Sequence, residues 1–277
     1  MLKVNIQHLH NINILNILLS TNLIGSSHQH FEILDSTNLA AVQLIAKARP
    51  KEGLVISADA QTAGVGQIGS TWHSEYAKNC LFSIVLYPTF LKAEHGFYLQ
   101  MAVCNAMKRS ISGLFPNLNL KIKWPNDLYC DDQKLAGLLI QTAIRGYYMD
   151  YAVIGIGINV NQVDFPLDIG SPTSLLLLLN QAVPRSQVMS EILHCLDEEY
   201  GRLQKHYPDP GTLSSILNEF ENNLYLHNIW ALYLDVDGLN LELYMEGVKP
   251  DGRLILRDRK GEELLYNFKE IKLLHPI

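Results

Sequence analysis

Lys123-Trp124-Pro125-Asn126-Asp127 is followed closely by Lys134-Leu135-Ala136-Gly137, so two lysines flank an Asn-Asp pair between two apolar, strand-like runs. A residue before proline is pushed out of the helical region, and Trp124 is therefore expected to be extended. Asn126-Asp127 then predicts a turn that directs its side chains outward rather than burying them. This pair of lysines, in a chain with few charges, indicates a site that neutralises a developing anion. A hairpin with a solvated charged tip is the alternative.

Bulk composition limits the class of protein. The 277 residues are 48% hydrophobic and 18% charged, which suits a globular protein with one large domain and a small one. A net charge of −6 argues against a nucleic-acid-binding face. The four cysteines are scattered, as in a reducing compartment, and no apolar run approaches the roughly 20 residues of a membrane span. Without a signal-peptide pattern, a cytoplasmic location is expected.

The first three quarters of the chain predict an α+β domain over residues 1–226, of which residues 1–20 are an uninformative N-terminal extension. Apolar periodicity and capping residues predict helices over 39–48, 96–114, 188–206 and 213–224. Apolar runs predict strands over 31–34, 54–58, 81–86, 120–124, 135–143 and 151–158.

The pattern changes after residue 226. Short strands are expected over 229–235, 239–248, 253–257 and 264–268. The pairs Asp237-Gly238, Asp251-Gly252 and Lys260-Gly261 separate them, and such pairs between alternating strands are hairpin signals. Residues 227–277 are therefore predicted to form a small β-barrel domain.

The glycine-rich loop Gly64-Val65-Gly66-Gln67-Ile68-Gly69 fits the G-x-G-x-x-G string of dinucleotide-binding proteins. That site also requires the loop to open a helix and an acidic residue about 20 positions later, and neither feature is present. A loop rich in backbone N–H groups that can approach an anion remains possible, as does a surface hairpin without chemistry. Gly155 and Gly157 lie within a strand and predict close packing, unless a ligand crosses there.

In order and spacing, these segments resemble the biotin–protein ligases from about residue 31 to 161. The matching set is Asp35-Ser36-Thr37-Asn38, Gln61 to Gly69 with Trp72, the Lys-Trp-Pro-Asn-Asp and Lys-Leu-Ala-Gly strings, and Gly155 to Asn159. The resemblance implies a seven-stranded mixed β-sheet flanked by helices, related to class II aminoacyl-tRNA synthetases, with a C-terminal SH3-like β-barrel. It also implies that biotin and MgATP form biotinyl-5′-AMP, and that biotin then passes to a lysine of a biotin carboxyl carrier protein domain. Because no DNA-binding module precedes the catalytic domain, the expected form is the short ligase.

The same resemblance assigns roles to single residues. Lys134 corresponds to the catalytic lysine at the biotin carboxylate. The biotin-binding set is Ser36, Thr37, Asn38, Gln61, Gly64, Val65, Gly66, Gln67, Trp72, Lys134 and Gly137. The nucleotide-binding set is Lys123, Asn126, Asp127 and Asn159, of which Asn126 and Asp127 would be the Mg²⁺ ligands.

One departure from the family concerns the glycine loop, where the family interleaves arginines. This chain has Val65, Gln67 and Ile68 at those positions, and the loop carries no cation. Two other functions stay open: a lipoate or octanoate ligase or transferase on a related fold, and a protein that binds biotin or its adenylate without transferring it. The sequence also leaves a homodimer open, and it does not identify the acceptor carboxylase.

Overall fold

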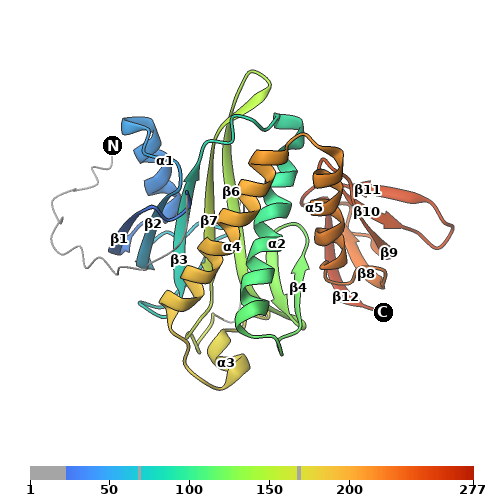
Figure 1. Ribbon diagram of the computed structural model, residues 1–277. Coiled ribbons are helices and arrows are strands. Elements are labelled where there is room, and N and C mark those ends of the chain that lie inside the picture. The colour runs from blue at the N-terminus through green and yellow to red at the C-terminus, as the bar shows by residue number, and fades with distance from the viewer. Residues whose placement is uncertain (1–22, 68–69, 167–169) are drawn as a thin grey trace.

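The computed structural model describes residues 23–67, 70–166 and 170–277. It contains a mixed seven-stranded sheet, a smaller antiparallel sheet at the C-terminus, and helices packed on the larger sheet (Figure 1). The N-terminal extension expected over residues 1–20 lies outside the described residues. Within the described ranges, no helix has both the length and the apolar character that a membrane crossing needs.

The larger sheet has the strand order β1-β2-β3-β7-β6-β5-β4. Its β1–β2 pair is parallel and the other pairs are antiparallel, which confirms the mixed sheet expected from the resemblance. The strands are β1 (Ser27–Leu34), β2 (Leu54–Gln61), β3 (Cys80–Leu86), β4 (Leu120–Lys123), β5 (Asp127–Cys130), β6 (Gln133–Arg145) and β7 (Tyr148–Ile158).

Five α-helices are present in the described part of the chain: α1 (Thr37–Ala48), α2 (Gly96–Leu114), α3 (Leu175–Leu179), α4 (Arg185–His206) and α5 (Pro210–Asn222), with a short 3₁₀ helix at Ala93–His95. Alternate residues of a strand face opposite sides of a sheet. In β7, Val153 packs in a small core with α1, whereas Ile154 joins the main core with α2 and α4. Helix α1 therefore covers one face of the sheet, and α2 and α4 cover the other.

The C-terminal strands form one antiparallel sheet in the order β11-β10-β9-β8-β12. They are β8 (Trp230–Asp235), β9 (Asn240–Val248), β10 (Leu254–Arg257), β11 (Glu263–Tyr266) and β12 (Ile271–Pro276). The three hairpin turns are confirmed, because Gly238, Gly252 and Gly261 all have positive φ. The all-β C-terminal unit expected from the sequence is present as this second antiparallel sheet. Its edge strands β11 and β12 do not pair with each other, so the barrel is not closed.

A single hydrophobic core joins the two sheets. Tyr233 and Met245 of the smaller sheet belong to the same buried cluster as Phe97 of α2 and Phe220 of α5. Helix α5 lies between α2 and the smaller sheet (Figure 1), and the Glu221 carboxylate accepts the Val248 backbone N–H at 2.9 Å. The division into domains at residues 226 and 227 stays a prediction, and removal of the smaller sheet would expose apolar surface of the larger unit.

Candidate active site

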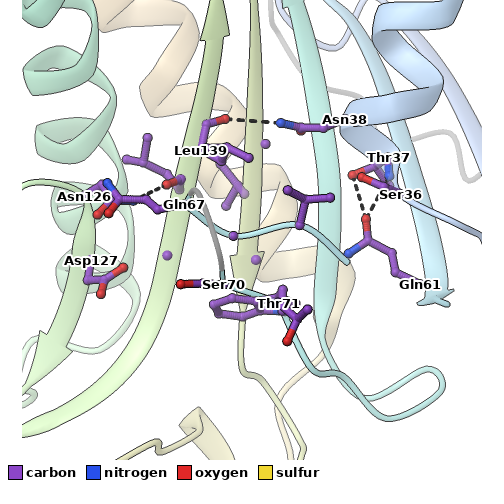
Figure 2. Close-up of a pocket in the computed structure, with 18 of the residues that line it drawn as sticks. Ser36, Thr37, Asn38, Gln61, Gln67, Ser70, Thr71, Asn126, Asp127 and Leu139 are labelled. Carbon is purple, nitrogen blue, oxygen red and sulfur yellow. Dashed lines mark hydrogen bonds between the residues drawn. The ribbon is translucent and has the colours of Figure 1, made fainter. Parts of the chain in front are cut away.

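A cavity of about 170 Å³ lies on the face of the large sheet that α1 partly covers, beneath the loop that follows β2 (Figure 2). Residues from α1, that loop, the β4–β5 turn, β6 and β7 line it. They are Ser36, Thr37, Asn38, Gln61, Val65, Gly66, Gln67, Ser70, Thr71, Trp72, Asn126, Asp127, Lys134, Gly137, Leu138, Leu139, Gly155, Ile156 and Gly157. The cavity thus joins most of the sequence segments that the resemblance singled out.

One end of the cavity is a neutral polar cluster at the start of α1. The Ser36 side chain caps the helix by accepting the Leu39 backbone N–H at 3.4 Å, so the capping interpretation and cavity lining both hold. Gln61 Oε1 accepts the Thr37 backbone N–H at 2.8 Å and lies 3.2 Å from Thr37 Oγ1 (Figure 2). This contact fixes the orientation of the Gln61 amide and leaves its Nε2 donors for another partner.

Polar groups behind the cavity wall hold the side chains of this end. The fully buried Ser83 Oγ lies 2.7 Å from Thr37 Oγ1 and 2.5 Å from Asn38 Oδ1. The Asn38 Nδ2 group donates to Leu139 O at 3.4 Å and to Gln141 Oε1 at 3.3 Å. Because the amide donates on that side, its oxygen must face Ser83. The network therefore locks the side chains that line the cavity into one orientation.

Two glycines of β7 make room for this arrangement. A Cβ added at Gly155 would lie 2.0 Å from Asn38 Oδ1, and one at Gly157 would lie 2.5 Å from the Trp72 ring. Both glycines share a face with Val153, and that face extends beyond the part covered by α1. The close packing predicted for them is confirmed, and its partners are the side chains of the cavity.

The other end of the cavity carries charge. Lys134 Nζ lies 2.7 Å from Asp127 Oδ2 and 5.8 Å from the centre of the Trp72 ring. The side chains of Lys134 and Asp127 are 32% and 21% exposed, so both remain accessible to a ligand. A single ammonium group thus sits between an aromatic ring and a carboxylate at the wall of the cavity.

The turn before β5 corrects one expectation from the sequence. Asn126 is buried rather than directed into solvent, and its Nδ2 group donates to Leu138 O at 2.5 Å. The strand pairing places Asp127 opposite Gly137 on β6, and this brings the turn against the neighbouring strand. That contact orients the amide, with its nitrogen toward Leu138 O, and the amide oxygen of Asn126 remains available as a ligand.

Three residues of the sequence-based set do not line the cavity. Gly64 packs against the Trp72 backbone, with a Cβ there only 2.4 Å from Trp72 O. Asn159 is buried and donates to Thr173 O at 2.9 Å. Lys123 Nζ donates to the Tyr129 hydroxyl at 3.2 Å. These contacts give all three a local structural role. The part of Gly64 in biotin binding and that of Lys123 and Asn159 in nucleotide binding stay predictions.

Charge nevertheless links Lys123 to the site. Burial lowers the pKa of the Lys123 ammonium group; the Asp127 carboxylate opposes this shift, and the positive charges of Lys134 and Lys272 add to it. Lys272 belongs to β12, so the smaller sheet brings a cation into the electrostatic surroundings of the charged end.

Sequence reasoning missed several residues that line or support the cavity. They are Ser70, Thr71, Leu138, Leu139 and, behind the wall, Ser83 and Gln141. Gly155, Ile156 and Gly157 also line the cavity; they belonged to the matching segments but were not included in the binding set. The period-2 alternation of strands could have found Ser83, because it interrupts the apolar run Leu81–Leu86 with one polar residue. The backbone contributions of Leu138 and Leu139 have no sequence signal of this kind.

The charged end offers oxygen ligands suited to Mg²⁺. Asp127 supplies a carboxylate and Asn126 an amide oxygen, both at the cavity wall. The described residues contain no group of three or more His, Cys, Asp or Glu side chains that could hold a metal ion on their own. Mg²⁺ is commonly held by one or two protein oxygens together with substrate phosphates, and the donors here fit that mode.

Comparisons with known proteins place the sequence among related families. The sequence profile of the Biotin/lipoate A/B protein ligase family matches residues 30–159. The bifunctional ligase/repressor BirA of Bacillus subtilis is 30% identical over 261 residues, which cover 90% of this chain and 75% of that protein. The biotin–[acetyl-CoA-carboxylase] ligase of Mycobacterium tuberculosis is 29% identical over 178 residues, which cover 62% of this chain and 65% of that protein.

The fold is also found among solved structures. A biotin protein ligase from Aquifex aeolicus in complex with biotin and ATP aligns with a TM-score of 0.73, covering 90% of this chain and 99% of that one. At 21% sequence identity this similarity establishes the fold alone. The family follows from the sequence identity over three quarters of the Bacillus subtilis protein. The chain therefore belongs to the biotin–protein ligase family, whose members are ligases.

Proposed function

We propose that this protein joins biotin to ATP to form biotinyl-5′-AMP and then transfers the biotinyl group to a lysine of a biotin carboxyl carrier protein domain. The observation that carries the proposal is one cavity with a neutral polar end at Thr37 and Gln61 and a charged end at Lys134 and Asp127. A neutral ureido ring and a carboxylate are the two ends of biotin, and they match this polarity.

The polar end would bind the ureido ring through groups that are already oriented. The Gln61 amide has its oxygen engaged by Thr37, so its N–H groups would donate to the ureido oxygen. The hydroxyl oxygens of Ser36 and Thr37 would accept the ureido N–H groups. A network fixed by Ser83 and Asn38 requires little reorganisation when the ligand binds, and this favours affinity.

The charged end would carry the chemistry. In the first step the biotin carboxylate attacks the α-phosphate of ATP, forming the C–O–P anhydride bond while pyrophosphate leaves. The Lys134 ammonium would reduce repulsion between the two anions and then stabilise the charge that develops on the phosphate. In the second step the deprotonated amine of the acceptor lysine attacks the activated carbonyl, and AMP leaves with the bonding electron pair.

Asp127 and Asn126 are the groups that would hold Mg²⁺ at the triphosphate. The metal supplies positive charge that offsets the negative charge of the phosphates. Asp127 pairs with Lys134, and a metal ion bound by the Asp127 carboxylate would leave the lysine available to the biotin carboxylate. Lys123 and Asn159 are proposed to support this nucleotide side from behind the cavity wall.

The function is tested by incubating the protein with ATP, labelled biotin and a carrier domain. A ligase transfers label to the carrier only when ATP is present. A lipoate or octanoate enzyme would label the carrier with those acids instead of biotin. A binding protein would retain biotin or its adenylate and leave the carrier unlabelled.

Gln61→Ala is expected to raise the biotin dissociation constant with little change in that for ATP. The substitution removes the ureido donor and leaves the Thr37 backbone N–H without its partner. Loss of such a buried hydrogen bond typically costs about 1–3 kcal/mol. Calorimetric titration measures both constants, and unchanged biotin affinity would exclude Gln61 as a ureido ligand.

Val65→Arg is expected to slow the escape of the adenylate. Val65 lies on the cavity wall and is half-exposed, in a loop whose sequence from residue 61 to 72 contains no Lys or Arg. A guanidinium group adds a charge-assisted contact that is stronger than a neutral hydrogen bond. The off-rate of biotinyl-5′-AMP, measured by chasing with unlabelled ligand, should fall, whereas an equal or faster off-rate would rule out this role for the loop.

A further inference from the structure

The β9–β10 hairpin of the smaller sheet contacts the Trp124 to Asn126 turn of the catalytic site. The Trp124 indole Nε1 donates to Gly252 O at 3.0 Å, and the Trp124 ring lies 5.1 Å from the ring of Phe268. We propose that this hairpin is a positioning element for the nucleotide side of the site. The inference rests on the proposed function and extends it to a part of the chain that carries no residue of the cavity wall.

The turn is held at successive residues, each by a different element. Gln100 of α2 donates to Pro125 O at 2.7 Å, and Asn126 donates to Leu138 O of β6. Trp124 is held by the hairpin alone among these elements. The three contacts hold consecutive residues of one short turn. Because Asn126 and Asp127 follow Trp124 within that turn, we expect loss of the Trp124 contact to displace them.

The hairpin packs closely against α2 at Gly252. Gly252 has φ +95°, and a Cβ there would lie 2.6 Å from Cδ2 of Phe97. Phe97 cannot retreat easily, because its ring packs against Phe220 at 5.8 Å and against Phe268 at 6.0 Å. Glycine at position 252 therefore serves two needs, a left-handed backbone and close approach to an aromatic ring.

Displacement of the hairpin is expected to affect ATP binding more than biotin binding. Asn126 and Asp127, the proposed metal ligands, follow Trp124 directly, and Asp127 also sets the position of Lys134 through their ion pair. The ureido end is held by a different network around Ser83, which makes no contact with the hairpin. Displacing the hairpin should weaken nucleotide binding and slow adenylate formation while leaving biotin affinity in place.

Gly252→Ala and Trp124→Phe test the proposal from the two sides of the contact. Gly252→Ala forces the hairpin away from Phe97, whereas Trp124→Phe removes the hydrogen bond and keeps a ring against Phe268. Gly238→Ala is the matched control, because Gly238 also has positive φ in a hairpin of the same sheet but nothing lies within 4 Å of its Cβ position. All three variants are compared in the full-length protein, after thermal melting has shown which are folded.

The KM for ATP in biotin-dependent pyrophosphate release should rise at least about tenfold in Gly252→Ala and Trp124→Phe. It should be unchanged in Gly238→Ala. The biotin dissociation constant should stay within about twofold of wild type in all three, a split that general destabilisation would not produce. Because Trp124→Phe makes the milder change, it keeps the test decisive if Gly252→Ala does not fold.

An unchanged KM for ATP in folded Trp124→Phe would overturn the proposal, and so would an equal loss of biotin and ATP affinity. Failure of the proposed function looks different, because the wild-type protein itself would then release no pyrophosphate with biotin and ATP.

Discussion

Lys134→Ala is expected to eliminate labelling of a carrier domain while leaving the protein folded. The Lys134 ammonium is the positively charged group on the cavity wall, and it can contact both the biotin carboxylate and the α-phosphate. Losing a preorganised charge of this kind typically costs about 3 kcal/mol or more in the transition state. The substitution also removes a partly exposed ion pair with Asp127, which contributes about 1 kcal/mol or less, so the melting temperature should fall only slightly. Single-turnover measurements of adenylate formation and of transfer to the carrier should both slow.

Lys121→Ala is the matched control for this loss. Lys121 lies on β4 of the same sheet, and its ammonium donates to Asn222 O on the protein exterior, away from the cavity. The control should label the carrier at the wild-type rate. Near wild-type labelling by Lys134→Ala would show that another group neutralises the reacting anions.

Gly155→Ala is expected to weaken biotin binding strongly, because no space exists for the added methyl group. Its Cβ would lie 2.0 Å from Asn38 Oδ1, inside the network that joins Asn38 to Ser83 and Gln141. Overpacking of this kind costs about 1–3 kcal/mol, which corresponds to roughly a fivefold to 150-fold increase in the biotin dissociation constant if the strain is relieved by moving Asn38. Calorimetric titration of biotin measures the effect.

Gly201→Ala, in the middle of α4, controls for the loss of a glycine, because nothing lies within 4 Å of its Cβ position. That variant should bind biotin like the wild type. If Gly155→Ala binds biotin with unchanged affinity and melts at an unchanged temperature, the Asn38 network can move without consequence and does not position the ligand.

Elements with a strong periodic pattern could be predicted from the sequence. Helix α2 spans the residues 96–114 that its apolar spacing predicts, and the three glycine-containing hairpin turns of the smaller sheet also agree. Strand β5 was not predicted, because its four residues directly follow the Pro125-Asn126 turn signal. Helix α3 is a run of five leucines, and such a run has no periodicity that distinguishes helix from strand.

The sequence predicted which residues belong to the candidate site better than it predicted how they are arranged. Ordered sequence segments identified Thr37, Gln61 and Lys134, all of which line the cavity. The burial of Asn126 could not be foreseen, since it depends on the pairing of β5 with β6, a contact between strands rather than a property of the turn. The open C-terminal sheet is a similar case, because short alternating strands are compatible with both an open and a closed arrangement.

The central claim is that the chain is an active biotin–protein ligase, and transfer of labelled biotin to a carrier domain tests it most directly. The wild-type protein is incubated with ATP, labelled biotin and the carrier, and the modified lysine is located by mass spectrometry. The account predicts ATP-dependent labelling of one carrier lysine, which is lost in Lys134→Ala and retained in Lys121→Ala. Tight binding of biotin with an unlabelled carrier, in the presence of ATP and Mg²⁺, would contradict it.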